Sequence, residues 1–201
     1  MKFTNAFEGV KKLYTAEIIG IATAVLSLIT SILGTAGKIP AAAVMLVIVG
    51  IASVVGFIIQ LIGLNSAGKD EGNFKTALYV VIAGIIISIL GTAIKSGFFS
   101  TVLTALEDLV NPIVTYLCIQ GIISLAGKLD DEAMKKKGND LFRIIITFYI
   151  IVFVLNIIVS ILNNKAVTTV AGILGIIAAI LSIVIYVKYI KYLKDARTML
   201  A

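Results

Sequence analysis

The sequence contains no histidine and a single cysteine among 201 residues. Without histidine, the usual zinc, haem and two-histidine iron sites are excluded. The lone cysteine, Cys118, allows no disulfide within the chain, and its place inside an apolar segment predicts a buried, unreactive thiol. No motif of nucleophile or phosphate chemistry is present either. We therefore expect neither enzyme activity nor a cofactor.

Apolar residues dominate instead. They make up 60% of the chain, against about 45–50% in a typical soluble domain. They are concentrated in six segments, at residues 15–35, 41–66, 76–94, 109–127, 143–163 and 166–187. Because about 20 apolar residues are enough for a helix to cross the hydrocarbon core of a bilayer, we predict an all-α integral membrane protein with six transmembrane helices. The chain, residues 1–201, then forms one transmembrane domain with no soluble catalytic domain.

The net charge of +6 comes from basic residues that flank these segments. With a cytoplasmic N-terminus, only Lys38, Lys95 and Lys165 lie outside. The other basic residues all fall in the cytoplasm: Lys2, Lys11, Lys12, Lys69, Lys75, Lys128, Lys135, Lys136, Lys137, Arg143, Lys188, Lys191, Lys194 and Arg197. This asymmetry predicts cytoplasmic termini and a multi-pass protein of the cell membrane. The lysine-rich, arginine-poor and isoleucine-rich usage favours a bacterial source and so the bacterial inner membrane. Since these charges form no stripe on a polar face, nucleic acid is not an expected partner.

The first dozen residues carry an apolar helical face formed by Phe3, Phe7, Val10 and Tyr14, with charged side chains around the rest. Such a pattern is typical of an interfacial helix that lies on anionic headgroups. A solvated helical start to the first span is the alternative interpretation.

A short sequence phrase recurs along the chain and divides it into similar parts. Residues 31–36, Ser-Ile-Leu-Gly-Thr-Ala, recur at 88–93, and a diverged form occupies 160–165. The ends of the second and fourth spans share Ala-Gly-Lys, at 67–69 and 126–128. Cutting at these points predicts three tandem helical hairpins, about 7–71, 72–138 and 139–201. All three would have the same orientation, related by a pseudo-threefold axis along the membrane normal.

Small residues recur at heptad spacing in the first span, at Gly20, Ala24, Ser27, Ser31 and Gly34. Such a seam lets helices pack closely in lipid. The repeat aligns Ser27 with Gly84 and with Asn156, which places one strong hydrogen-bonding side chain on the seam. We expect the Asn156 amide to bond a neighbouring helix and to act as structural glue.

Few polar side chains lie inside the predicted spans. Glu17 falls near the cytoplasmic end of the first span, within one or two turns of Lys11 and Lys12. Snorkelling or local ion pairing explains it more simply than a proton relay. Gln60 and Gln120 are the strongly polar candidates near the inner halves of the second and fourth spans.

Glu107 and Asp108 allow two interpretations. Residues 99–110 have an apolar stripe and could form a separate helix flat on the outer surface, with Pro112 starting the fourth span. Alternatively, the repeat predicts one helix from about 100 to 127 that is kinked at Pro112. The acidic pair would then face the outer lysines Lys38, Lys95 and Lys165, in a vestibule that could admit a small charged solute or bind lipid headgroups. Simple anchoring at the membrane surface is the other interpretation of these charges.

The absence of buried charges favours a non-enzymatic structural or accessory subunit that self-associates or binds another membrane protein. The alternative is a small transporter or channel, for example a solute-binding transporter subunit, with a path along the pseudo-threefold axis. The lipid bilayer is the one partner that both interpretations require.

Overall fold

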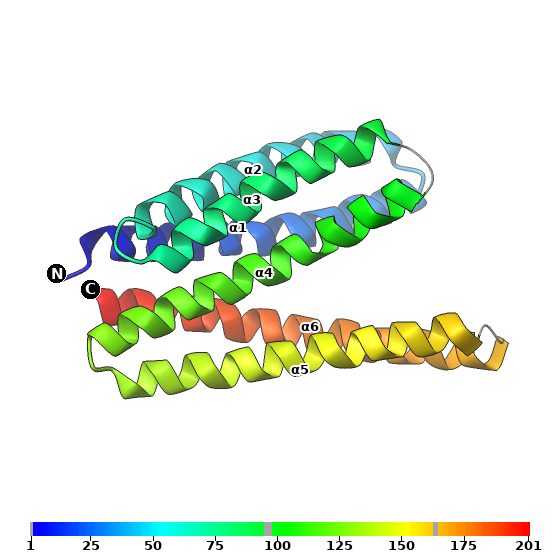
Figure 1. Ribbon diagram of the computed structural model, residues 1–201. Helices are drawn as coiled ribbons and strands as arrows, with labels where there is room; N and C mark the ends of the chain where they lie inside the picture. The colour runs from blue at the N-terminus through cyan, green and yellow to red at the C-terminus, as the bar shows by residue number, and fades with distance from the viewer. Residues whose placement is uncertain (1, 95–97, 163–164) are drawn as a thin grey trace.

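In the computed structural model the described residues form six α-helices: α1 (Thr4–Thr35), α2 (Ile39–Ala67), α3 (Gly72–Ala93), α4 (Phe98–Lys128), α5 (Glu132–Leu162) and α6 (Lys165–Leu200). The structure describes residues 2–94, 98–162 and 165–201, with side chains at all of these except 98, 101, 153, 155–162, 165–177 and 179. Consecutive helices are neighbours, and α6 returns to contact α1 (Figure 1). The helices therefore follow one another around a closed cycle.

Four of these helices, within the described residues, are long and apolar enough to cross a membrane: Thr4–Thr35, Ile39–Ala67, Gly72–Ala93 and Val102–Lys128. Most of their apolar side chains point outward, as expected of surfaces that contact lipid rather than water. Several such helices in one chain mark a multi-pass membrane protein. The predicted all-helical fold is confirmed, while the orientation of the termini stays a prediction.

The short turns are built from specific terminal residues. After α1, Gly37 adopts φ +73°, and the amides of Gly37 and Lys38 bond back to the carbonyls of Gly34 and Leu33. This is a Schellman motif, which needs a left-handed residue where glycine is least strained. After α4 the same motif uses Asp130, with φ 57°, and Asp131 Oδ1 then accepts the Met134 amide at 2.9 Å. That N-cap starts α5 at Glu132, earlier than the predicted cut at 138.

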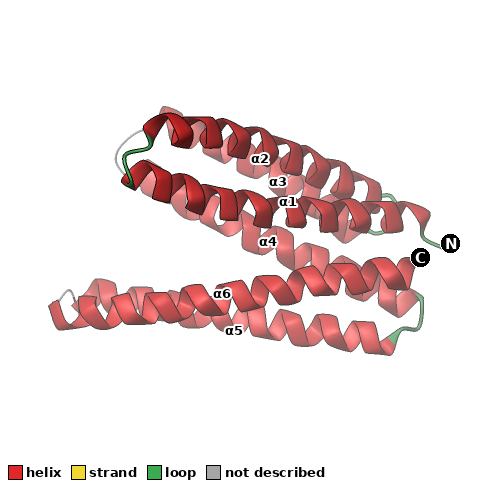
Figure 2. Cartoon of the chain, turned by 180° about the vertical axis from the view of Figure 1, so that it is seen from behind, coloured by secondary structure: helices red, strands yellow, loops and turns green. Residues whose placement is uncertain are grey.

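The buried core lies at one end of the bundle, which we call the closed end. It comprises the start of α1, the α2–α3 and α4–α5 turns and the end of α6, and both termini lie there (Figures 1 and 2). Its largest fully buried side chains are Phe74, Leu13, Leu64, Ile119, Ile122, Leu125 and Leu193. Because they come from α1, α2, α3, α4 and α6, one apolar cluster joins all three hairpins.

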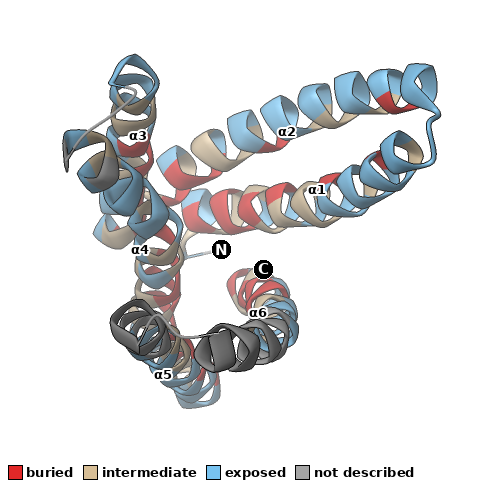
Figure 3. Cartoon of the chain, turned by 90° about the vertical axis from the view of Figure 1, so that its right-hand side faces the viewer, coloured by how far each residue is buried: buried red, intermediate tan, exposed pale blue. Residues whose placement is uncertain are grey.

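The opposite end, which we call the open end, contains the α1–α2 turn and the far ends of the hairpins. The α5–α6 hairpin runs away from the other four helices in that direction (Figure 2). Along α1 and α2 the buried residues cluster toward the closed end and the exposed ones toward the α1–α2 turn (Figure 3). Side-chain packing within the chain therefore weakens from the closed end to the open end.

The first dozen residues do not form a separate interfacial helix, because α1 is continuous from Thr4. Val10 is fully buried, and Phe3, Phe7 and Tyr14 pack against the core. The apolar face predicted to lie on headgroups instead covers the closed end of the protein.

The small-residue seam packs in one hairpin and not in another. In α3, a Cβ added to Gly84 would lie 2.8 Å from Val110 of α4, so the two helices touch there. In α1, Ala24, Ser27 and Ser31 are exposed. All three hairpins start and finish at the closed end, but the threefold relation between them stays a prediction.

Candidate functional site

A cavity of about 460 Å³ lies where the three hairpins begin to separate. Its lining comes from α1, α2, α4, α5 and α6 and is polar and aromatic to an unusual degree for apolar helices. The residues are Ala16, Glu17, Ile19, Gly20, Thr23, Ser53, Gly56, Phe57, Gln60, Asn111, Val114, Thr115, Tyr149, Tyr186 and Tyr189. Segments that are distant in sequence thus place their polar residues around one space.

Glu17 supplies the carboxylate of this cavity. The Tyr186 hydroxyl of α6 donates a hydrogen bond of 2.5 Å to Glu17 Oε2, and its oxygen also lies 3.3 Å from the Glu17 carbonyl oxygen. Gly20 leaves room for this contact, since a Cβ there would lie 3.2 Å from the same hydroxyl. No ion pair joins Glu17 to Lys11 or Lys12 among the described residues. A tyrosine rather than a lysine therefore holds the carboxylate.

The cavity has a buried floor and an exposed mouth. Ala16, Val114 and Tyr189 are buried toward the closed end. Ser53, Asn111 and Tyr149, farther along their helices from that end, are exposed. The polar lining is therefore reachable from the side where the hairpins separate.

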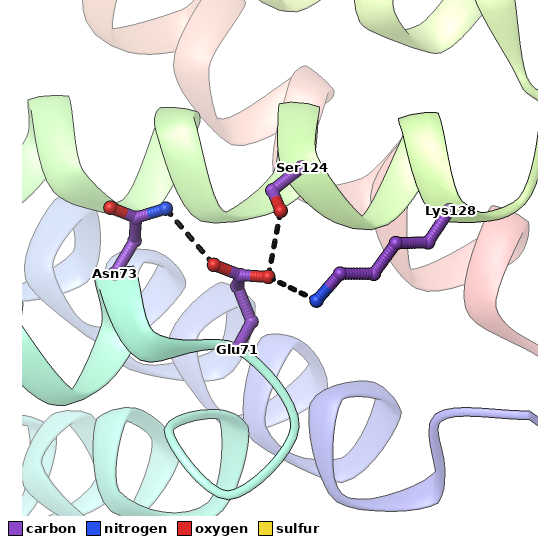
Figure 4. A network of polar contacts seen from close by, with 4 residues as sticks. All are labelled: Glu71, Asn73, Ser124 and Lys128. Carbon is purple, nitrogen blue, oxygen red and sulfur yellow. Dashed lines mark hydrogen bonds and ion pairs between the residues drawn. The ribbon is translucent and has the colours of Figure 1, made fainter.

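A second polar group, at the closed end of the bundle, is centred on Glu71 (Figure 4). Glu71 precedes α3, and its Oε2 accepts hydrogen bonds from Lys128 Nζ at 2.6 Å and Ser124 Oγ at 2.7 Å, both on α4. Asn73 Nδ2 donates to the other oxygen at 3.0 Å. Burial alone would raise the pKa of the Glu71 carboxyl, but these hydrogen bonds and the charge of Lys128 outweigh it and lower the pKa from 4.5. Glu71 is thus an ionised clamp between α3 and α4.

Further polar contacts tie the other hairpins to this end. Asp70, in the α2–α3 turn, accepts the Ala6 amide at 2.8 Å and the Asn5 side chain at 3.0 Å, so it caps the start of α1 across the hairpin. Lys137 of α5 pairs with Asp195 of α6 at 3.0 Å. The closed end is therefore held by apolar packing and by charges from all three hairpins.

The structure brings together two of the polar residues predicted from the sequence, Glu17 and Gln60. Gln120 is half-buried on α4 and does not line this cavity. Lys38 is exposed at the α1–α2 turn. Lys95 and the side chains of Asn156 and Lys165 lie outside the described residues.

Glu107 and Asp108 are exposed on α4. Because α4 is one helix from Phe98 to Lys128 with Pro112 inside it, the interpretation of a separate surface helix at residues 99–110 is wrong. The long helix that the repeat predicts is the one observed.

Four residues of the cavity were not predicted from the sequence: Tyr186, Tyr149, Tyr189 and Asn111. Tyrosines near the ends of apolar spans resemble ordinary interfacial anchors. The spacing of Tyr186 and Tyr189 does place them on one face of α6, but only the return of α6 to α1 brings that face to Glu17. Glu71 was not predicted because two of its three partners, Ser124 and Lys128, lie on α4, more than fifty residues away.

Comparison with known protein families, curated proteins and solved structures found no match for this chain. Within the part of the chain that the structure describes, no group of three or more histidine, cysteine or acidic side chains is positioned to hold a metal ion. Hypotheses about function therefore depend on the cavity itself.

Proposed function

We propose that this membrane protein binds a small polar solute in the cavity between its hairpins and serves as a transporter, channel or solute-binding transporter subunit. The observation that carries the proposal is the cavity of about 460 Å³ with a carboxylate and several hydroxyl and amide groups inside a bundle of apolar helices. Polar and ionisable groups are costly within a membrane, and where they occur they mark solute or ion pathways. The role is non-catalytic.

A small transporter or channel was the alternative interpretation of the sequence, after an accessory subunit. The absence of buried charges favoured an accessory subunit, and the presence of Glu17 in the cavity weakens that support. Pockets that bind small molecules are commonly about 300–1,000 Å³, with a few convergent polar groups, and this cavity falls in that range.

The orientation predicted from the lysines completes the proposal. It places the closed end in the cytoplasm and the mouth of the cavity toward the outer side. The polar clamp of Glu71 and Lys128 would then seal the cytoplasmic side beneath a solute. A transport cycle would require that seal to loosen, whereas a binding subunit would leave the release step to a partner protein.

A matched pair of glycine substitutions on α1 tests the proposal. Gly20 lines the cavity, whereas an added Cβ at Gly34 would meet nothing within 4 Å. Gly20→Leu should fill the cavity, and Gly34→Leu should not. Proteoliposomes would be incubated with a defined mixture of amino acids, amines, sugars and nucleobases, and retained solutes would be quantified by mass spectrometry.

We expect at least one solute to be retained by the wild-type protein and by Gly34→Leu, and to fall to background with Gly20→Leu. If Gly20→Leu does not fold, Ser53→Leu at the mouth provides the second variant. The proposal would be wrong if no solute were retained above protein-free liposomes. An accessory role would then be the better interpretation.

A further inference from the structure

The described lining of the cavity carries negative charge and no positive charge. Among its described lining residues Glu17 is the only carboxylate, and none is lysine or arginine. Inside a low-dielectric bundle, such an unbalanced carboxylate favours a positively charged ligand and repels a negatively charged one. The lining therefore predicts that the ligand carries a positive charge.

The geometry leaves Glu17 able to bind such a ligand. Tyr186 holds one carboxylate oxygen, Oε2, and this bond orients the group without neutralising its charge. No lysine or arginine in the described part of the chain lies within ion-pair distance of Glu17. The carboxylate is therefore positioned but not paired.

The rest of the lining suits an organic cation. Phe57, Tyr149, Tyr186 and Tyr189 contribute four aromatic rings, whose faces attract ammonium groups. The amide and hydroxyl oxygens of Gln60, Asn111 and Thr115 can accept N–H hydrogen bonds. The volume, about 460 Å³, is far more than a bare metal ion fills and falls in the range of pockets that bind small molecules.

From these observations we propose that the cavity recognises an alkylammonium group, with its charge beside Glu17 and its carbon chain against the aromatic rings. This inference rests on the proposed solute-binding function and specifies the chemical class of the solute. The group can belong to a soluble amine or to the headgroup of phosphatidylethanolamine, because the mouth of the cavity is exposed.

The test uses the full-length protein in nanodiscs of phosphatidylglycerol, with propylammonium as probe and its near isostere 1-propanol as neutral comparison. Binding is measured by calorimetry and by the shift in thermal unfolding. We expect propylammonium to bind and propanol to bind much more weakly. Glu17→Gln, which keeps an acceptor for Tyr186, should lower propylammonium affinity by about thirtyfold or more.

Glu107→Gln is the matched control, because it removes the same charge from an exposed position on α4, outside the cavity lining. It should leave propylammonium affinity unchanged. If Glu17→Gln does not fold, the wild-type preference for propylammonium over propanol still decides the proposal.

Replacing half of the lipid by phosphatidylethanolamine separates the two sources. A Glu17-dependent fall in propylammonium affinity identifies the lipid headgroup as a competing ligand, and an unchanged affinity identifies a soluble amine. Equal binding of propylammonium and propanol, or no effect of Glu17→Gln, would overturn the cation inference. Solute retention that depends on Gly20 would in that case still support the proposed function.

Discussion

The closed end and the open end of this bundle use similar apolar residues for different purposes. At the closed end, side chains such as Leu13, Leu64 and Ile122 are fully buried against other helices. At the open end, Leu28, Ile32 and Ile89 on the same kinds of helix are largely exposed. Hydrophobicity alone therefore does not distinguish a residue that packs within the protein from one that faces lipid.

The two ends differ in the small and charged residues that lie among these apolar side chains. A Cβ at Gly9 would lie 2.5–2.6 Å from Ala67, so α1 and α2 approach almost to backbone contact at the closed end. Gly34, Gly50 and Gly91 have open space around them. In a bilayer, close packing and interhelical hydrogen bonds hold helices together, because lipid gives no hydrophobic driving force between them. The closed end has both, with Gly9 against Ala67 and the hydrogen bonds of Glu71.

The largest effect should come from the aromatic core of the closed end. Phe74 is fully buried and lies against Gly121, where a Cβ would come within 2.7 Å of its ring. Phe74→Ala should lower the free energy of unfolding by about 3–5 kcal/mol. Tyr79→Ala is the matched control on α3, because Tyr79 is 57% exposed, and its effect should stay within about 0.5 kcal/mol. Thermal or denaturant unfolding in detergent measures both, and equal losses would contradict the difference between the ends.

The second-largest effect should be the change in unfolding free energy on replacing glycine by alanine in α1. Its sign should differ between two glycines. Gly9→Ala forces α1 and α2 apart and should destabilise the protein by about 1–3 kcal/mol. Gly34→Ala meets no neighbour and should stabilise it by about 0.5–1 kcal/mol, because alanine loses less backbone entropy in a helix. The same unfolding assay applies. Destabilisation by both would mean that the open end is packed as well.

The third effect should depend on pH. Because the folded-state pKa of Glu71 lies below its ordinary 4.5, the stability it contributes is present above pH 4.5 and is lost as pH falls through the lowered value. Glu71→Gln should cost about 1–3 kcal/mol at pH 7, toward the lower figure because Lys128 is 46% exposed. Below pH 4.5, the difference in unfolding free energy between the wild-type protein and Glu71→Gln should become smaller.

Glu132→Gln is the control for that experiment. Glu132 pairs with Lys135 on the surface at 3.0 Å, three residues along the same helix, and should contribute less than about 0.5 kcal/mol. A loss in Glu132→Gln as large as that in Glu71→Gln would show that the clamp between α3 and α4 has no special role.

The smallest effect should come from the link between α5 and α6. Lys137 and Asp195 are both partly exposed, so Lys137→Gln should cost only about 0.2–1 kcal/mol and less in high salt. Unfolding at low and high ionic strength measures this. A larger, salt-independent loss would place the pair inside the closed-end core rather than at its rim.

Much of the fold was predictable because it depends on local pattern. Runs of apolar residues identified the helices, and alignment of the Ala-Gly-Lys phrases at 67–69 and 126–128 correctly extended α4 back past Glu107 and Asp108. The predicted apolar span at 143–163 covers only part of α5, which begins at Glu132 because Asp130 forms the turn and Asp131 caps the new helix.

The site was harder to predict because its contacts are not local. Glu17 and Gln60 were recognisable as polar residues in apolar spans, but Tyr186 is separated from Glu17 by 169 positions. Without a second carboxylate or a basic partner, nothing in the sequence pairs these two residues. Only the structure shows that α6 returns to α1 and so places Tyr186 beside Glu17.

The most direct test of the central claim is whether water reaches the polar cavity. In a Cys118→Ala background, Ser53→Cys places a thiol at the mouth, and Val54→Cys places one on a neighbouring position of α2 that is 59% exposed and does not line the cavity. A water-soluble maleimide applied to native membranes should label Ser53→Cys and leave Val54→Cys, which faces lipid, unmodified. Equal labelling at the two positions, or no labelling at Ser53→Cys, would contradict a hydrated cavity between the hairpins.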